Sequence, residues 1–398
     1  MSPQDIVLKR WGKMLLGIFF SLIFFGLIFF VTFASFLVDK NMNAVEPHEE
    51  YYVTARAESL HKNMIIMDWH SDTLLWDRSL LTRNDYGHVD MPRLMEGNVS
   101  FQMFTTVTKS PSGQNLHENS DASDRITPLI IAQLWPPKTW NSLLERALYQ
   151  AKKLSQFAEA SDGEIVFIKN RRQFTKVLEA RSRGKAILGA LLGTEGAHTL
   201  EGKLSNIDKM YKAGFRMMGI THFFDNELGG SLHGTKKGGL TKFGHKAVRR
   251  MIRKNMIIDL AHASEAVVRD VLAIPDAAVV VSHTGLRGTC DSPRNLPDDL
   301  IKQIAAKGGI IGIGFWDKAV CDVSPIGIAK TILYGIELVG ADHIALGSDW
   351  DGTITAAITP DELQIITQIL MTAGVPAADI SKIMGMNSVN FLMQNLPD

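Results

Sequence analysis

The sequence predicts a barrel of eight parallel strands and surrounding helices, a (β/α)8 fold, preceded by one long apolar segment. Three observations lead to this prediction. Residues 14–38 contain no charged side chain. Beyond residue 60, short apolar runs alternate with longer amphipathic ones, as strands and helices do in α/β proteins. Side chains that can bind metal ions follow most of the apolar runs, at the positions where barrel enzymes place their sites.

The N-terminal apolar segment is long enough to span a membrane as a helix. A hydrocarbon core needs about 20 apolar residues, and residues 14–38 provide 25 positions. Basic residues precede the segment and acidic ones follow it. The positive-inside bias therefore places residues 1–13 in the cytoplasm and the remainder outside, on the periplasmic side of an inner membrane if the chain is bacterial. A cleaved signal peptide is the alternative, but its apolar core is usually only about 7–15 residues. We expect an uncleaved anchor at 14–38 and a polar tether at 39–60.

Composition excludes several classes of protein. The 42 basic and 42 acidic side chains leave no net charge for neutralising phosphates, so no nucleic-acid partner is expected. A hydrophobic content of 45%, with 33 glycines and 14 prolines, does not fit a disordered or fibrous chain. Cys290 and Cys321 are too few for a disulfide scaffold. They form either one bridge or two buried free thiols.

The expected strands are short and apolar almost throughout, as strands buried on both faces of a parallel sheet are. They occupy residues 64–69, 99–107, 186–193, 215–221, 256–260, 278–282, 310–315 and 343–347. Helices are expected between them at 203–213, 244–254, 264–272, 297–306 and 324–339. The largest insertion, 108–185, separates the second and third strands and contains an amphipathic helix at 141–159. The barrel domain therefore covers residues 61–398.

An open doubly wound sheet is the structural rival of the barrel. Such sheets often bind a dinucleotide through a Gly-x-Gly-x-x-Gly loop after the first strand, and that loop is absent from this sequence. Gly312 and Gly314 lie inside an expected strand, where small residues relieve crowding between barrel strands. The barrel is therefore preferred.

Polar side chains with metal-binding potential follow six of the eight expected strands. They lie in the segments 68–72, 193–198, 221–222, 259–262, 282–283 and 347–351. A lone histidine that ends a strand is more often a hydrogen-bonded core residue than a ligand. Six suitable strand ends in one barrel are much harder to explain by chance.

These residues predict two metal sites. His70 and Asp72 point to the same side of their strand, because residues i and i+2 share a face, and could hold one divalent ion, with zinc the preferred candidate. His262 and His283, at the ends of adjacent strands, could hold a second ion. Glu195 lies between the two groups and could bridge both ions. Two such ions would share and deprotonate a water, producing a hydroxide nucleophile at neutral pH.

A carboxylate is also expected to transfer the proton. Asp349 lies across the barrel mouth and is free to take the proton of the nucleophile and deliver it to a leaving amine. Asp351 competes for this role, but Asp349 is nearer the end of its strand. His198 is expected to support the start of a helix and not to bind metal.

These motifs resemble those of the membrane (renal-type) dipeptidases, zinc metallopeptidases of the amidohydrolase-like barrel superfamily. The resemblance covers about residues 60–395. It rests on the order and spacing of MDWHSDTL, VDMPRLMEGNVSFQMF, GTEGAH, GFRMMGITH, GLTKFG, IDLAHAS, VVVSHTGLRGTCDSPRNLPDD and IALGSDWDG. It implies a centre of two Zn2+ per chain, with His70 and Asp72 on one ion, His262 and His283 on the other, and Glu195 bridging.

The resemblance also implies roles in substrate binding. His222 would bind substrate and stabilise the tetrahedral oxyanion, and Arg294 would pair with the terminal carboxylate of a dipeptide. From the residues alone, Arg294 is equally compatible with a surface loop. The family also implies tolerance of a D-residue at the C-terminal position. This chain has Gly314-Phe315-Trp316 where the family often has Asn-Phe-Tyr, so a hydroxyl on the substrate side is missing and the substrate preference is left open.

The sequence as a whole predicts a membrane-anchored, extracytoplasmic zinc dipeptidase. The loop 228–240 and the insertion 108–140 are expected to wall its substrate cavity, and a homodimer is left open. One alternative is a deaminase or phosphotriesterase-like hydrolase. Those enzymes that bridge their metals with a carbamylated lysine are disfavoured, because no lysine ends a strand here. The other alternative is a non-catalytic, membrane-tethered binding barrel, which the complete set of ligands disfavours.

Overall fold

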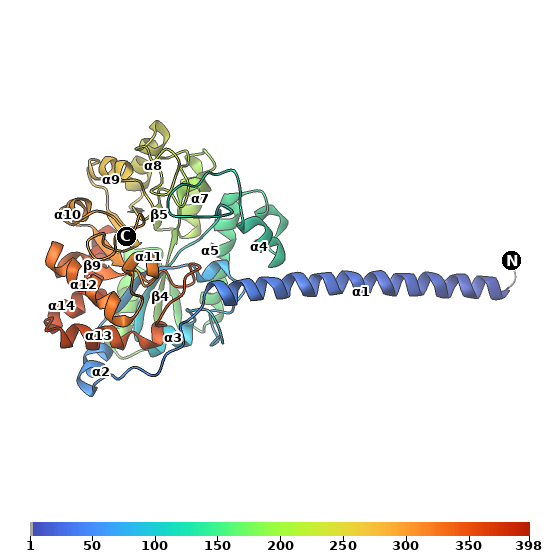
Figure 1. Cartoon of the computed structure of the whole chain (residues 1–398), viewed down its shortest axis with the longest axis horizontal. Helices are drawn as coiled ribbons and strands as arrows, with labels where there is room; N and C mark the ends of the chain where they lie inside the picture. The colour runs from blue at the N-terminus through green and yellow to red at the C-terminus, as the bar shows by residue number, and fades with distance from the viewer. Residues whose placement is uncertain (1–2) are drawn as a thin grey trace.

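Eight parallel strands form a closed barrel in the computed structural model, which describes residues 3–398 (Figure 1). The barrel strands are β1 (Ile66–Ser71), β2 (Val99–Phe104), β4 (Leu188–Thr194), β5 (Met217–Gly219), β6 (Ile257–Asp259), β7 (Val279–Thr284), β8 (Ile310–Ile313) and β9 (Ile344–Leu346). Neighbours in this order are paired, and the pairing of β1 with β9 closes the ring. All eight predicted strands are therefore confirmed, as is the (β/α)8 architecture.

One further strand, β3 (Ile165–Phe167), was not predicted. It pairs with the first half of β4, with Val166 opposite Gly189. The second half of β4 pairs with β5, with Gly193 opposite Met217. Strand β3 lies between α5 (Leu143–Ala160) and α6 (Arg171–Ser182) in the insertion. Three residues between two helices are too short to show a strand periodicity, so the pattern missed it.

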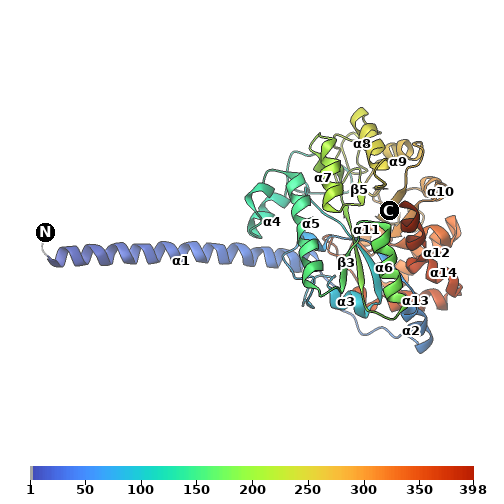
Figure 2. The same cartoon turned by 180° about the vertical axis from the view of Figure 1, so that it is seen from behind.

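The remaining helices surround the barrel (Figures 1 and 2). They are α2 (Ala55–Lys62), α3 (Met91–Glu96), α4 (Ile126–Ala132), α7 (Ser205–Ala213), α8 (Lys242–Ile252), α9 (Glu265–Leu272), α10 (Asp298–Ala306), α11 (Asp317–Val320), α12 (Pro325–Val339), α13 (Gln364–Thr372), α14 (Ala377–Ser381) and α15 (Asn387–Asn395). Short helical turns lie at Thr73–Leu75, Pro137–Thr139, Ala197–Leu200, Ala341–His343, Pro360–Glu362 and Lys382–Met386. The predicted start of α9 is confirmed, because the Ser264 side chain accepts the backbone N–H of Val267 and caps the helix.

Alternate residues of the barrel strands belong to two apolar layers. Side chains such as Met67, Phe101 and Met217 fill the barrel interior, while their neighbours along the strands pack against the surrounding helices. Helix α15 contributes Phe391 to the interior layer, and the Trp69 indole N–H donates to Ser388 Oγ at 2.8 Å. The apolar interior therefore leaves the carboxyl ends of the strands as the face open to substrate.

Glycines in the barrel strands allow close packing, as predicted for Gly312. A side chain at Gly312 on β8, or at Gly347 directly after β9, would collide with the backbone oxygen of Ser282 on β7. Ser282 lies beside the predicted metal ligands, so these glycines permit the strands that carry the site to approach one another.

The two cysteines form a disulfide bridge, which settles the question left open by the sequence. Cys290 and Cys321 have Cα atoms 5.4 Å apart and close a loop with a sequence separation of 31. A loop of this size corresponds to about 3–4 kcal/mol of stabilisation in the chain-entropy account. The bridge joins the loop after β7, which carries Arg294, to the chain that follows Trp316 and α11.

Helix α1 (Pro3–Met42) projects from the barrel domain in both views (Figures 1 and 2). Residues Lys9–Met42 are long and apolar enough to cross a membrane, with a mean hydropathy of 2.8 in their most apolar window. The helix extends past the predicted anchor at 14–38 and ends only at Met42. The segment after it adds a parallel bridge between Val45 and Ala356.

The end of α1 is fixed to the barrel by a buried ion-pair network. Ser35 and Asp39 lie one turn apart on the helix and Asn43 follows its last residue, and all three are buried against the domain. Asp39 Oδ2 accepts from Arg78 Nε at 2.8 Å, and Arg78 Nη2 lies 2.8 Å from Asp351 Oδ1. Asn43 donates to Asp39 Oδ1 at 2.8 Å. The helix end therefore forms part of the folded domain.

Replacing Asp39 by alanine should destabilise this domain. The change leaves the buried Arg78 guanidinium with one carboxylate partner in place of two, and removing one member of a buried ion pair typically costs about 3–5 kcal/mol. Thermal unfolding of the full chain in detergent should therefore show a lower midpoint. Glu49→Ala is the matched control, because Glu49 is exposed. Equal midpoints for the two variants would contradict the proposed contribution of the network.

Candidate active site

The predicted ligands converge at the carboxyl ends of the barrel strands. His70 lies on β1 and His283 on β7, whereas Asp72, Glu195 and His262 lie in the turns that follow β1, β4 and β6. All five are at least 96% buried. The structure therefore brings together side chains that are more than 200 positions apart in the sequence.

Glu195 lies at the centre of the cluster. Its Oε1 is 3.0 Å from His262 Nε2, 3.2 Å from His283 Nε2 and 3.7 Å from His70 Nε2. Its Oε2 is 3.3 Å from His222 Nε2. Two ligand atoms bound to one tetrahedral zinc ion at about 2.0–2.2 Å lie about 3.3–3.6 Å apart. The spacing around Glu195 is close to that range, so one carboxylate can reach more than one ion.

Three overlapping groups of side chains could each hold an ion, and Glu195 belongs to two of them. The groups are His70 with Glu195 and His283, Glu195 with His222 and His262, and His70 with Asp72 and Asp349. His70 Nε2 is 3.6 Å from Asp72 Oδ1 and 3.8 Å from Asp349 Oδ1. The nitrogens His262 Nε2 and His283 Nε2 are 3.0 Å apart. The cluster therefore contains all five predicted ligands and adds His222 and Asp349 at its edge.

A single serine orients two of the histidines. Ser282 Oγ donates to Asp259 Oδ2 at 2.7 Å and lies 2.9 Å from both His70 Nδ1 and His283 Nδ1. Because its one proton goes to the carboxylate, the hydroxyl must accept from the Nδ1–H of both rings. The Nε2 atoms then face the cluster, and His70 Nε2 has no hydrogen-bond partner in the described structure. This is how protein hydrogen bonds prepare imidazoles for metal binding.

Sequence reasoning did not assign roles to Ser282, Asp259 or Asp68. Asp68 accepts from the backbone N–H of Ser348 at 2.7 Å and from Gln102 Nε2 at 2.6 Å, which joins β1 to its two neighbours below the site. The sequence offered one signal for it, since Asp68 alternates with His70 and Asp72 on the same strand face. No comparable local signal marks Ser282.

The electrostatics of the cluster favour bound cations. Burial raises the pKa of the Glu195 carboxyl well above its ordinary value, Asp72 raises it further, and His70 opposes both. Burial alone would lower the pKa of His70, but Asp72, Glu195 and Asp349 raise it to about 10. Closely spaced buried carboxylates repel one another unless positive charge lies between them. A divalent cation would supply that charge and replace the proton on His70 Nε2.

The other three histidines are electrically neutral bases. Burial lowers the pKa of His222, His262 and His283 well below the ordinary value. Neutral imidazole nitrogens combined with carboxylate oxygens form a donor set that suits zinc and other borderline divalent ions. The residues present therefore fit a metal centre.

The carboxylates of Asp349 and Asp351, the two candidates for proton transfer, have different contacts in the structure. Both residues adopt a left-handed backbone conformation, with φ of 65° at Asp349 and 63° at Asp351, but the Asp349 carboxylate lies beside His70. Burial raises its pKa to about 8, although His70 opposes this. Asp351 instead binds Arg78 and accepts from Thr73 Oγ1 at 2.7 Å, so its carboxylate is fully used in holding the loop.

Arg294 is buried in the wall of the site, so it is not a surface loop residue. Its Nη2 donates to the carbonyl oxygen of His283 at 2.8 Å, and its guanidinium lies 5.3 Å from the Trp316 ring centre. Burial lowers its pKa to about 10, so the side chain stays cationic near neutrality. His198 lies outside the ligand groups, with Nε2 2.9 Å from Thr108 Oγ1.

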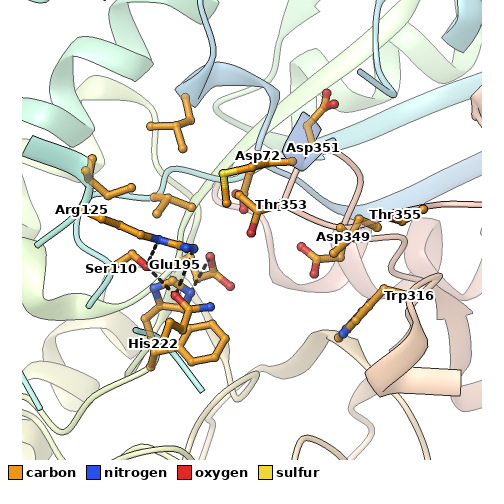
Figure 3. Close-up of a pocket in the computed structure, with 18 of the residues that line it drawn as sticks. Asp72, Ser110, Arg125, Glu195, His222, Trp316, Asp349, Asp351, Thr353 and Thr355 are labelled. Carbon is orange, nitrogen blue, oxygen red and sulfur yellow. Dashed lines mark hydrogen bonds and ion pairs between the residues drawn. The ribbon is translucent and has the colours of Figure 1, made fainter. Parts of the chain in front are cut away.

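A cavity of about 1220 Å³ opens above the cluster (Figure 3). Glu195, His222 and Asp349 face this space, and Trp316 lies on the same side as Asp349. The insertion lines the cavity as predicted, and it adds Arg125, which sequence reasoning missed and which donates to Ser110 Oγ at 2.9 Å. The prediction for the loop 228–240 was wrong. Its residues line none of the cavity and lie behind the wall, where Ser231 Oγ donates to the carbonyl oxygen of His222.

The family model described as membrane dipeptidase (peptidase family M19) matches residues 54–395. The chain belongs to this family. The match covers the whole barrel and every residue of the cluster, so this protein is a dipeptidase and hydrolyses peptide bonds. The resemblance inferred from the motifs is confirmed.

Curated relatives of this dipeptidase include two fungal enzymes. It is 30% identical to Dipeptidase verJ of Clonostachys rogersoniana over 223 residues, which cover 54% of this chain and 57% of that protein. It is 26% identical to Dipeptidase ataJ of Aspergillus terreus over 377 residues, which cover 85% of this chain and 86% of that protein.

A solved metallopeptidase from Rhodobacter sphaeroides has the same fold. It superposes on the dipeptidase with a TM-score of 0.67 and 21% identity, covering 84% of this chain and 99% of that chain. Its structure holds a phosphinate mimic of the dipeptide L-Ala-D-Ala.

Replacing Ser282 by alanine should weaken metal binding without removing a ligand. Both His70 and His283 lose the acceptor that fixes their Nδ1–H, and losing such a partner typically lowers metal affinity about 10–100-fold. Competition with a chelator of known affinity measures the change. His198→Asn is the control, because it alters a buried histidine outside the ligand groups. Unchanged affinity in the Ser282 variant would show that the serine does not orient the ligands.

Proposed function

We propose that this dipeptidase is a membrane-anchored, extracytoplasmic zinc enzyme that hydrolyses dipeptides at a centre of two metal ions. The observation that carries the proposal is the convergence of His262, His283 and His70 on the Glu195 carboxylate, with Asp72 beside His70. His70 and Asp72 would hold one ion and His262 and His283 the other, with Glu195 shared. The mixture of imidazole and carboxylate donors favours zinc.

When bound, the two ions would supply Lewis acidity that lowers the pKa of water, so that an activated nucleophile exists at neutral pH. The protein residues would carry out the remaining steps. Asp349, whose Oδ1 is 3.8 Å from His70 Nε2, would take up the proton of the nucleophile and deliver it to the leaving amine. His222, on the opposite side of Glu195, would stabilise the oxyanion.

The substrate would be oriented by its terminal carboxylate. Arg294 is a cation at neutral pH, lies in the cavity wall and can present two parallel N–H groups to a carboxylate. This contact requires a free carboxyl group next to the scissile bond, which a dipeptide offers at its single peptide bond. It therefore suits dipeptides as substrates.

Two features support the proposed location. Helix α1 is apolar enough to span a bilayer, and the basic residues at its start favour a cytoplasmic N-terminus. The Cys290–Cys321 bridge is of the kind that persists in oxidising compartments outside the cytoplasm. Both are what an anchored extracytoplasmic enzyme requires.

Asp349→Asn should abolish dipeptide turnover and retain about two zinc ions per chain. The amide cannot take up the proton, whereas the five proposed ligands are untouched. Plasma emission on zinc-replete protein gives the metal content, and amine release gives the turnover. Loss of both zinc and activity would mean that Asp349 is a ligand. Fewer than about one zinc per wild-type chain would contradict the zinc enzyme itself.

Dipeptides with a D-residue at the C-terminal position should be hydrolysed, whereas those with a D-residue at the N-terminal position should not. The structure of the Rhodobacter sphaeroides relative holds a phosphinate mimic of L-Ala-D-Ala, and this chain has the same fold. A panel of the four L- and D-alanine combinations, assayed on the full chain, measures the preference. Hydrolysis of L-Ala-L-Ala alone would contradict the D-residue prediction while leaving the dipeptidase activity intact.

A further inference from the structure

The substrate cavity is larger than a dipeptide needs. Its volume of about 1220 Å³ exceeds the range of about 300–1,000 Å³ that is typical for pockets binding drug-sized ligands. A dipeptide held between Arg294 and the metal ligands would leave much of this space unfilled. The cavity therefore has room for a substituent on the peptide.

The chemistry of the walls divides the cavity into two parts. One part is polar and contains the groups that act on the peptide, namely Asp72, Glu195, His222, Arg294 and Asp349. The other part is mainly apolar and combines the end of α1, helix α4 and the turn after β1, with Ala34, Val38, Met42, Leu75, Trp76, Ile126, Leu129 and Ala132. The polar side chains of Ser35 and Arg125 also line the cavity beside these residues in the sequence. An apolar region that continues from a catalytic centre favours an apolar ligand group.

Helix α1 presents one stripe of side chains to this apolar part. Ala34, Val38 and Met42 are spaced four residues apart and so share one face of the helix. The neighbouring stripe is the one that the Asp39 network fixes to the barrel. Thr353, in the loop after Asp349, also donates its backbone N–H to Asn43 Oδ1 at 2.9 Å. The helix end is thus a fixed wall and cannot swing away as a loose tether would.

Helix α4 forms the other side of the apolar part. It packs against α1 and lies beside it in both views (Figures 1 and 2). Ile126, Leu129 and Ala132 recur every three residues, which places them along one side of α4. The space between the two helices is therefore lined by aliphatic groups from both.

We propose that Val38 and Met42 of helix α1 are specificity-determining residues, and that the preferred substrates are dipeptides that carry a bulky apolar side chain. The apolar part of the cavity would receive that side chain while Arg294 holds the carboxylate. The inference rests on the proposed binding mode, in which the polar part takes the peptide itself. It makes the end of the anchor helix a working part of the active site.

Two matched series of dipeptides test the proposal on the full chain in detergent. Each keeps one glycine and places an unbranched alkyl side chain of increasing length on the first or the second residue. Burial of each methylene group should raise kcat/KM by about two- to fourfold until the cavity is filled. The gain is expected in at least one series. No gain in either series, with glycyl-glycine still hydrolysed, would overturn this inference and leave the proposed function standing.

Substitutions on α1 show whether the helix supplies the wall. Val38→Asn and Met42→Gln should each reduce the gain per methylene group at least twofold, because a polar side chain then faces the alkyl group. Leu37→Asn is the control, since Leu37 has the same 40% exposure as Val38 and lies outside the cavity. Zinc content confirms that each variant is folded. A full gain in both folded variants would overturn the role of the helix, and no hydrolysis by any zinc-loaded protein would overturn the proposed function as well.

Discussion

The buried carboxylate of Glu195 is the group on which the rest of this active site depends. It lies among histidine nitrogens at 3.0 to 3.7 Å and is itself 4% exposed. A carboxylate in such a place is stable only when positive charge surrounds it. The other features follow from this requirement. Asp72 and the imidazoles complete a cation site, and Ser282 turns two of the rings toward it.

Much of the fold was predictable because buried parallel strands leave a simple pattern. Each barrel strand is a short, nearly continuous apolar run, and each predicted run corresponds to an observed strand. Strand β3 could not be predicted, because its three residues lie between two helices and are too few to show a pattern. The sequence also did not predict that α1 continues beyond residue 38. Its last residues are polar, and only their contacts with Arg78 and Thr353 explain why the helix continues to Met42.

The sequence predicted which side chains gather at the barrel mouth, but not which groups orient them. Strand ends identified His70, Glu195 and His283 because metal-binding side chains are rare in apolar surroundings. The role of Ser282 depends on His70, which is 212 positions away, and on Asp259 in the neighbouring strand. The sequence around Ser282 does not distinguish it from other serines, because its partners come close only in the folded barrel. The roles proposed for Asp349, His222 and Arg294 stay predictions, since geometry places these groups but does not show what they do.

The absence of a break between α1 and the barrel has a mechanical consequence. An enzyme on a flexible linker can rotate freely above a bilayer and present its opening in any direction. Here the helix continues to Met42, and its end is clamped by Asp39 and Arg78. In a bilayer, the tilt of the helix would therefore set the direction in which the cavity opens. Membrane thickness and curvature would change the tilt of α1 and thereby the orientation of the whole barrel.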